Sequence, residues 1–182
     1  MTQCPKCAGK TRPVLVDEYN DEHMGIPVIL VNAITQEICV DCGAVASTII
    51  PDHKGLIAAV AISRIIDPLK LNGQEIRFLR KALNFNGKEF AERLEVAPET
   101  VSRWEHDKEI MGPAREKLLR LIVGKNLSEH AMAMDFTSDT IIDMRIQSVR
   151  AHEPSAILLE RVKVKFPEHP SEKYWGEFDE AA

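Results

Sequence analysis

Apolar residues in the first fifty positions gather in β-branched runs, a pattern that favours strands. Residues 13–19 and 27–34 are two such runs, and the turn-rich stretch 20–25 between them predicts a hairpin. A third run covers residues 44–50. From residue 54 to residue 66 the apolar positions recur at helical spacing, and Asp67-Pro68 is typical of a helix end. We therefore expect a small sheet followed by one helix.

Short helices are predicted from residue 72 onward. Asn72 and Asn86 are each followed three residues later by a glutamate, the capping-box arrangement that begins a helix. Val101 and Trp104 lie one helical turn apart and predict the inner side of a third helix.

Gly112-Pro113 predicts the start of a fourth helix. In that helix we expect Gly124 to lie past the C-terminal end. We expect the inward side chains to be Leu118, Leu119 and Ile122.

The region from residue 128 has a weaker pattern. Residues 140–149 and 156–166 are apolar runs separated by Pro154, and the second alternates apolar residues with lysines, so we interpret the two as a strand pair. The last aromatic residues stand among acids with few apolar neighbours, which predicts a mobile or partner-bound segment. These aromatic residues are Tyr174, Trp175 and Phe178.

All four cysteines of the chain fall in two C-x-x-C pairs, Cys4 with Cys7 and Cys39 with Cys42. The chain starts without the basic and apolar segments of a signal peptide, and no run approaches the roughly 18 apolar residues of a membrane helix. We therefore expect a cytoplasmic protein with no membrane partner. In a reducing compartment, paired cysteines are more often metal ligands than disulfides.

The four thiolates predict one structural Zn²⁺ per chain, because two C-x-x-C turns complete a tetrahedral sphere and leave no open position for catalysis. The 31 residues between Cys7 and Cys39 leave room for a hairpin. Buried or redox-active cysteines are one alternative. Iron in a rubredoxin-like site is another, although Ala8 follows Cys7 where a second glycine would be expected beside Gly43.

Charge is distributed unevenly over the three segments. Residues 1–67 have five Lys and Arg against eight Asp and Glu, residues 68–127 have twelve against nine, and residues 128–182 have six against eleven. The formal net charge of -5 therefore conceals a positive middle segment. This distribution favours phosphate binding in the middle and protein partners at the ends.

Residues 90–105 have the pattern of a DNA-binding helix-turn-helix, whose last helix enters the major groove. Arg103 is the best candidate for base recognition, because a guanidinium can bond to both O6 and N7 of guanine. Glu99 could accept from cytosine or orient Arg103. Thr100 and Ser102 should share this outer side.

Asn86, Gly87 and Lys88 begin the preceding helix, where backbone amides and the lysine suit a DNA phosphate. A purely structural helical bundle with a solvated charged face is the alternative. The modest positive charge predicts weak binding by one copy, so we expect a homodimer that reads a palindromic operator in double-stranded DNA.

The predicted fold class is α+β. It comprises a small zinc-clipped β domain at residues 1–67, an all-α repressor-like helix-turn-helix domain at 68–127 and an acidic C-terminal extension at 128–182 with a strand pair.

At this point the cysteine pairs, Gly43 and the run Val101-Ser-Arg-Trp-Glu105 resemble the MqsA-type (YgiT-type) zinc-finger/helix-turn-helix antitoxins, with an Xre-like DNA-binding domain, over roughly residues 1–125. The resemblance implies a zinc domain that neutralises an mRNA-cleaving toxin and a second domain that dimerises on its operator and represses its own genes. It also implies that Glu99 and Arg103 occupy DNA-reading positions. Ala97 stands where the family usually has a Ser or Thr helix cap, which lowers the stability of the helix by about 1 kcal/mol.

The leading hypothesis is therefore the antitoxin of a type II toxin-antitoxin system. The alternative is a stand-alone zinc-containing transcriptional regulator without a toxin. An enzyme is the weakest hypothesis, because the sequence has no evident nucleophile-base pair, phosphate loop or open metal position.

Overall fold

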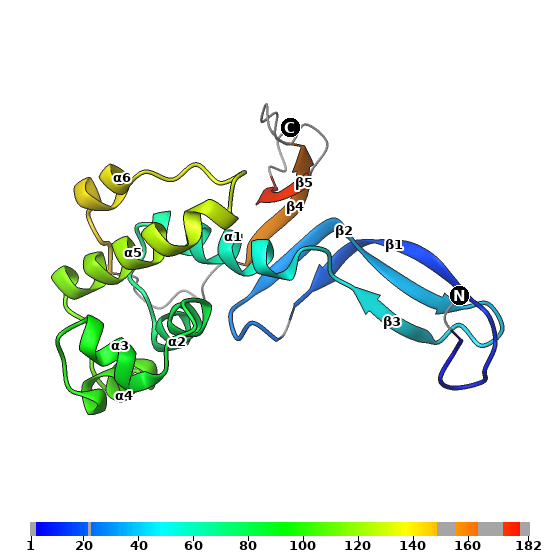
Figure 1. The fold of residues 1–182 in the computed structure, drawn as a ribbon, viewed down its shortest axis with the longest axis horizontal. Helices are drawn as coiled ribbons and strands as arrows, with labels where there is room; N and C mark the ends of the chain where they lie inside the picture. Colours follow the sequence, from blue (N-terminus) through cyan, green and yellow to red (C-terminus); the bar gives the residue numbers. More distant parts are fainter. Residues whose placement is uncertain (1–2, 22, 149–155, 164–172, 179–182) are drawn as a thin grey trace.

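The computed structural model describes residues 3–21, 23–148, 156–163 and 173–178. It has an α+β fold with a mixed five-stranded sheet and a group of helices. Part of the sheet extends from the helices as an elongated arm, and the N-terminus lies at the tip of that arm (Figure 1).

The arm is formed by the three strands that the sequence predicts. Strands β1 (Thr11–Asn20) and β2 (Val28–Cys39) form an antiparallel hairpin. Strand β3 (Val45–Ile49) pairs with the last part of β2 on its other side. The start of β1 and the end of β2 therefore meet at the tip, next to the two cysteine pairs.

Two C-terminal strands complete the sheet. Strand β4 (Ile157–Lys163) lies parallel to the first part of β2, and β5 (Lys173–Glu177) pairs antiparallel with β4. The extension thus contains a strand pair, but not the one that the sequence pattern predicts. Residues 140–143 belong to helix α6 (Ser138–Asp143), which begins where the side chain of Thr137 caps the amide of Thr140. Parts of both predicted runs, residues 149 and 164–166, lie outside the described residues.

The prediction of a mobile or partner-bound segment at the last aromatic residues is wrong for Trp175, which is only 1% exposed and packs within the chain itself. Its Nε1 donates to the carbonyl oxygens of Pro51 and Asp52, and the guanidinium of Arg161 lies 5.3 Å from its ring centroid. Trp175 therefore packs on residues far away in the sequence, which supply the apolar surroundings that its own neighbours lack.

Helix α1 (His53–Ile66) links the sheet to the helices. It contacts β4 and β5 as well as α2 and α5. Buried apolar residues form one cluster that runs from Leu30 in β2 through Leu56 and Val60 in α1 to Val123 in α5. A single core therefore crosses position 67, where the sequence suggests a boundary between domains.

The four helices predicted after residue 72 are confirmed as α2 (Gly73–Ala82), α3 (Gly87–Arg93), α4 (Pro98–Glu105) and α5 (Pro113–Leu127), which is followed by the 3-10 turn η1 (Ser128–His130). Both predicted capping boxes are present, with Asn72 capping α2 and Asn86 capping α3. Among the described residues, none of the helices combines the length and the apolar character needed to cross a membrane.

Two details predicted for α5 are wrong. Gly124 lies inside the helix, where a Cβ atom would come within 2.0 Å of the Phe136 ring. The glycine therefore permits close packing and does not cap the helix. Leu118 points outward and is 41% exposed, whereas Leu119 and Val123 are fully buried.

Candidate metal centre and nucleic-acid interface

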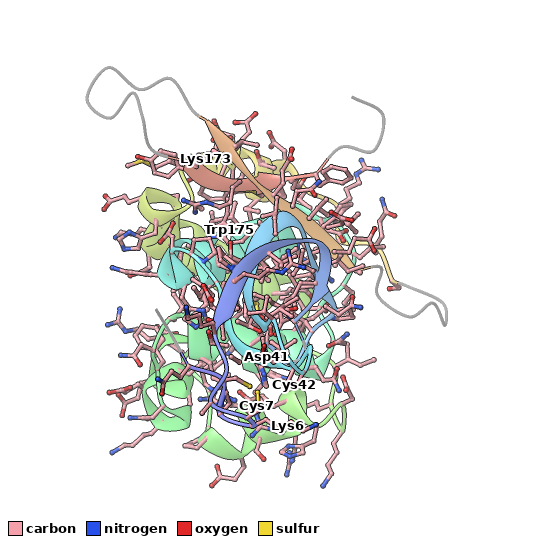
Figure 2. All side chains as sticks on the ribbon, turned by 90° about the vertical axis from the view of Figure 1, so that its right-hand side faces the viewer. Lys6, Cys7, Asp41, Cys42, Lys173 and Trp175 are labelled. Atoms are coloured by element: carbon pink, nitrogen blue, oxygen red, sulfur yellow. The ribbon has the colours of Figure 1, made fainter. Side chains whose placement is uncertain are left out.

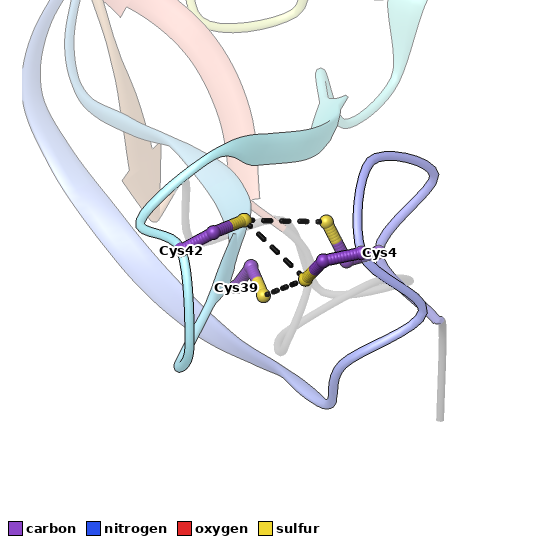
Figure 3. A group of neighbouring side chains, drawn as sticks. Cys4, Cys39 and Cys42 are labelled. Atoms are coloured by element: carbon purple, nitrogen blue, oxygen red, sulfur yellow. Dashed lines mark hydrogen bonds between the residues drawn. The ribbon is translucent and has the colours of Figure 1, made fainter.

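The four cysteines come together at the tip of the arm, and their sulfur atoms all lie within 4.8 Å of one another. The Sγ atoms of Cys7 and Cys39 are 3.4 Å apart, those of Cys7 and Cys42 3.5 Å, and those of Cys4 and Cys42 3.7 Å (Figure 3). Zinc-thiolate bonds of about 2.3 Å in a tetrahedron give sulfur separations of about 3.8 Å. The cluster is compatible with a tetrahedral metal site.

The hairpin explains how residues so distant in sequence meet. Thr11 pairs with Cys39, so the second cysteine turn begins where β1 starts. The amide of Val40 donates to the carbonyl oxygen of Lys10, and Gln3 pairs with Lys10 in an isolated antiparallel β-bridge. Figure 2 looks down on this tip, where Lys6, Cys7, Asp41 and Cys42 lie close together.

Both cysteine turns share one backbone geometry. In the first, the amide of Lys6 donates to the Sγ atom of Cys4, at 3.4 Å. The residue after each turn adopts a left-handed conformation, with φ of 59° at Ala8 and 68° at Gly43. Glycine adopts this region without a steric cost, whereas alanine adopts it at a cost of roughly 1 to 2 kcal/mol, so the first turn carries strain that the second avoids.

Gly9 allows the two turns to approach each other, and the sequence analysis did not identify it. A Cβ atom at this position would lie 2.1 Å from Oδ2 of Asp41 and 3.2 Å from Sγ of Cys39. The only sequence signal was its position two residues after Cys7.

The cysteines differ in exposure and acidity. Cys4 and Cys39 are buried, whereas Cys7 and Cys42 are exposed. The amide of Cys42 stabilises the Cys39 thiolate and, despite opposing desolvation, the pKa of Cys39 falls to about 7. The Gly9 amide lowers the pKa of Cys7, but hydrogen bonds with the thiols of Cys39 and Cys42 outweigh it and raise that pKa to about 12. Only a cation could hold four thiolates this close together.

The arm also exposes large apolar side chains. Leu15 and Ile49 are more than half exposed and lie in one row across the sheet, because each pairs with Thr35 of β2. Val40 and Val45 are exposed nearer the tip. We call these four side chains the arm apolar residues.

The predicted outer and inner sides of α4 agree with the structure. Glu99, Ser102 and Arg103 are exposed and Thr100 is half-buried. Val101 and Trp104 are buried in the core. The four candidate DNA contacts therefore share one accessible side, and their role in DNA binding stays a prediction.

The C-terminal end of α4 is fixed to α2. Arg80 donates to both carboxylate oxygens of Glu105, at 2.6 and 3.1 Å. The amide of Gly73 donates to Oδ1 of Asp107 at 2.7 Å, and a Cβ atom at Gly73 would lie 2.6 Å from the carbonyl oxygen of Trp104. These contacts hold the candidate recognition helix in one orientation.

The carboxylate beside Arg103 belongs to Glu109, whose Oε2 lies 3.6 Å from Nη1 of Arg103. The sequence analysis instead named Glu99 as the carboxylate that could orient Arg103. Both partners are well exposed, so the guanidinium stays accessible.

At the start of α3, Oδ1 of Asn86 accepts from the amides of Lys88 and Glu89. The Lys88 amide, which we expected to be available to a phosphate, is therefore used by the cap. The Lys88 side chain remains exposed, with Nζ 4.0 Å from Glu92, and Gly87 is half-buried. Ala97, at the start of α4, makes no side-chain cap bond, as the sequence predicts.

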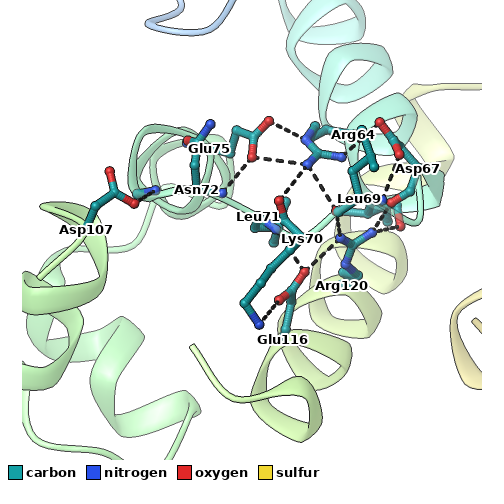
Figure 4. A network of polar contacts seen from close by, with 12 residues as sticks. Arg64, Asp67, Leu69, Lys70, Leu71, Asn72, Glu75, Asp107, Glu116 and Arg120 are labelled. Carbon is teal, nitrogen blue, oxygen red and sulfur yellow. Dashed lines mark hydrogen bonds and ion pairs between the residues drawn. The ribbon is translucent and has the colours of Figure 1, made fainter. Parts of the chain in front are cut away.

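A buried network of charges joins α1 to α2 and α5 and was not predicted (Figure 4). Arg64 in α1 donates to both carboxylate oxygens of Glu75 in α2. Arg120 in α5 donates to Glu116, which also lies 3.5 Å from Nζ of Lys70. Burial lowers the pKa of Arg120, and the carboxylate of Glu116 opposes that shift. Arg120 also donates to the carbonyl oxygens of Ile65, Asp67 and Leu69.

Comparison with known proteins does not assign the chain to a family. No protein-family model matches the chain, and no curated protein matches it. Function must therefore be inferred from the cysteine cluster, the arm apolar residues and the exposed side of α4.

Proposed function

We propose that the chain is the antitoxin of a type II toxin-antitoxin system. Its arm neutralises a protein toxin, for which an mRNA interferase fits best, and α4 binds operator DNA to repress the operon. The observation that carries this proposal is the combination of a four-cysteine cluster on an exposed arm with an accessible, well-anchored α4 in one molecule.

Zn²⁺ is the metal that best suits the cluster, because a set of four thiolates is typical of closed structural zinc sites. Cys4, Cys7, Cys39 and Cys42 would be its ligands. The tip has little buried apolar surface of its own, so an ion that joins the two turns stabilises it directly.

The α4 surface suits a DNA major groove. Arg103 presents a forked donor for guanine, and Glu99, Thr100 and Ser102 flank it on the same helix. Asn86, Gly87 and Lys88 suit the phosphate backbone, now through the Lys88 side chain instead of its amide.

The arm apolar residues favour a protein partner over a stand-alone regulator. Exposed apolar side chains that gather on one part of a surface commonly mark binding sites. Residues 1–67 are acidic, which is complementary to the basic cleft of an RNA-cleaving toxin. A stand-alone regulator would use the same α4 surface but would leave these side chains without a function.

DNA recognition is tested by selecting bound sequences from random duplexes and measuring the ratio of specific to non-specific affinity. Arg103→Ala should lower this ratio by about 5- to 160-fold, because one bidentate contact is worth roughly 1 to 3 kcal/mol of discrimination. Salt-dependent non-specific binding should persist.

The matched control is Arg77→Ala, which removes an exposed arginine of α2 and should leave the ratio unchanged. If no sequence is enriched, or if Arg103→Ala keeps the full ratio, the proposed reading of DNA by α4 is wrong.

A further inference from the structure

The four cysteines at the tip of the arm are of two kinds. Cys4 and Cys39 are only 3% and 2% exposed. Both are held by the backbone around them, because the amide of Cys4 donates to the carbonyl oxygen of Gly9 and Cys39 is the last residue of β2. Cys7 and Cys42 are exposed. Each C-x-x-C turn therefore contributes one buried and one exposed cysteine.

The two exposed sulfur atoms are neighbours across the turns. The Sγ atoms of Cys7 and Cys42 are 3.5 Å apart (Figure 3). The sulfur atoms of a disulfide are about 2 Å apart, so the turns need to approach by only about 1.5 Å to join them. Neither residue belongs to a strand, so this movement leaves the pairing of β1 with β2 intact.

Exposure also decides which of the four cysteines a solute can oxidise. A bound metal keeps its cysteine ligands as thiolates, the nucleophilic form of the side chain. A hydroperoxide in the solvent reaches Cys7 and Cys42, whereas protein shields the sulfur atoms of Cys4 and Cys39. Susceptibility to oxidation follows thiolate character and exposure, and a second thiolate beside the first completes the reaction.

We propose that Cys7 and Cys42 form a peroxide-sensitive site, at which a disulfide between the two turns forms and the metal is released. The Cys7 thiolate attacks one oxygen of the hydroperoxide, becomes a sulfenic acid and displaces hydroxide or alkoxide. The Cys42 thiolate then attacks that sulfur, forms the S–S bond and displaces hydroxide. The two sulfur atoms lose two electrons in total, and the oxygen–oxygen bond of the peroxide accepts them.

This oxidation removes two of the four ligands. Cys4 and Cys39 alone cannot complete a tetrahedral sphere. The disulfide holds the two turns together in place of the metal, so a thiol reductant can restore the original site. A disulfide within each C-x-x-C pair would instead leave the turns unconnected.

Two of the arm apolar residues lie beside these turns. Val40 follows Cys39 and is 58% exposed, and Val45 lies three residues after Cys42 and is 50% exposed. The amide of Val40 donates to the carbonyl oxygen of Lys10, close to the first turn. Movement of the turns therefore alters one end of the surface proposed for the toxin, and in this respect the inference rests on the proposed function. Peroxide should weaken the binding of that partner.

Treatment of the full chain, loaded with Zn²⁺, with hydrogen peroxide tests the site. A weak chromophoric chelator reports the released metal, and free thiols are alkylated before the disulfides are mapped by mass spectrometry. One metal ion per chain should be released as the Cys7–Cys42 disulfide forms, while Cys4 and Cys39 should stay open to alkylation. A thiol reductant with added Zn²⁺ should restore the loaded protein.

Two histidine variants separate the exposed pair from the buried pair, because three cysteines and one histidine also make a typical closed zinc site. Cys42→His removes one partner of the disulfide, so release of the metal by peroxide should slow about tenfold or more. The matched control Cys39→His keeps both exposed cysteines and should release its metal at close to the wild-type rate. The disulfide map of the wild type decides the assignment even where a variant fails to bind Zn²⁺.

The proposed site is wrong if peroxide releases no metal, if the disulfide joins any other pair, or if Cys7 and Cys42 are oxidised to sulfinic acids without a bond between them. Neither DNA nor a toxin takes part in these measurements, so failure of the oxidation site is distinguishable from failure of the antitoxin function. A Cys7–Cys42 disulfide in a chain that binds no protein partner would refute the proposed function alone.

Discussion

At the residue scale, Ala8 and Gly43 are a natural pair for comparison. Both follow a C-x-x-C turn in a left-handed conformation, but only glycine adopts it without a steric cost. No atom lies within 4 Å of a Cβ built at Gly43, so a substitution there changes backbone energy without creating a clash.

Gly43→Ala should therefore lower the free energy of unfolding of the metal-loaded protein by about 1 kcal/mol, the left-handed penalty of an L-residue. Ala8→Gly should raise it by about 0.5 kcal/mol, because relief of that penalty is partly offset by the greater entropy of the unfolded chain. Chemical denaturation measures both. Equal effects of the same sign would contradict the assigned strain.

At the candidate site, the sequence predicted some residues and missed others. The cysteine spacing predicted the cluster, because a metal requires a fixed set of ligands whatever surrounds it. Gly9 was missed, because its function depends on Asp41 of the other turn. The partner of Arg103 was missed for the same reason, since Glu109 comes from the loop after α4 and not from the helix itself.

At the element scale, helices whose start is set by neighbouring residues were predicted well, whereas strand pairings between distant parts of the chain were not. The capping boxes at Asn72 and Asn86 depend on residues three positions apart, and both helices start where predicted. The pairing of β4 with β2 depends on residues more than a hundred positions away, and Trp175 is buried by the segment before α1. No local window of sequence contains that information.

The buried network joins elements and leads to a further prediction. Glu75→Gln keeps a side chain that can cap Asn72 but removes the buried one of the two carboxylates beside Arg64, and leaves that of Asp67, whose Oδ2 lies 3.2 Å from Nη1 of Arg64. It should lower the free energy of unfolding by about 2 to 3 kcal/mol, less than the roughly 3 to 5 kcal/mol of a buried charge that loses every partner. Denaturant titration followed by circular dichroism measures this.

Two further variants make that test specific. Arg64→Met combined with Glu75→Gln should recover much of the loss, because no buried charge is then left unpaired. Glu92→Gln changes an exposed carboxylate beside Lys88 and should alter stability by less than about 1 kcal/mol. A Glu75→Gln protein as stable as the Glu92→Gln control would show that the network contributes little.

At the scale of the whole molecule, one core joins the base of the arm to the helices, while the tip depends on its cysteines. Cys39→Ser, or removal of the bound metal by a chelator, should therefore disrupt the tip without unfolding α1. Amide hydrogen exchange should accelerate over residues 4–15 and 35–47 and stay slow in α1. Loss of protection in α1 as well would show that the metal stabilises the entire fold.

Neutralisation of a protein partner by the arm is tested by capture of that partner from the native host. Tagged full-length protein is incubated with host lysate at physiological salt, and the retained proteins are identified and quantified by mass spectrometry. Deletion of residues 1–67 is unsuitable, because it would remove α1 and with it part of the single core. The arm is therefore altered by Leu15→Glu with Ile49→Glu, and Ile142→Glu is the matched control.

The wild type and the control should retain one small basic protein in stoichiometric amount, and the arm variant should lose it. Addition of the purified chain should suppress the RNA-cleaving activity of that protein. Retention of operator DNA with no stoichiometric protein partner would contradict the antitoxin proposal and support a stand-alone regulator.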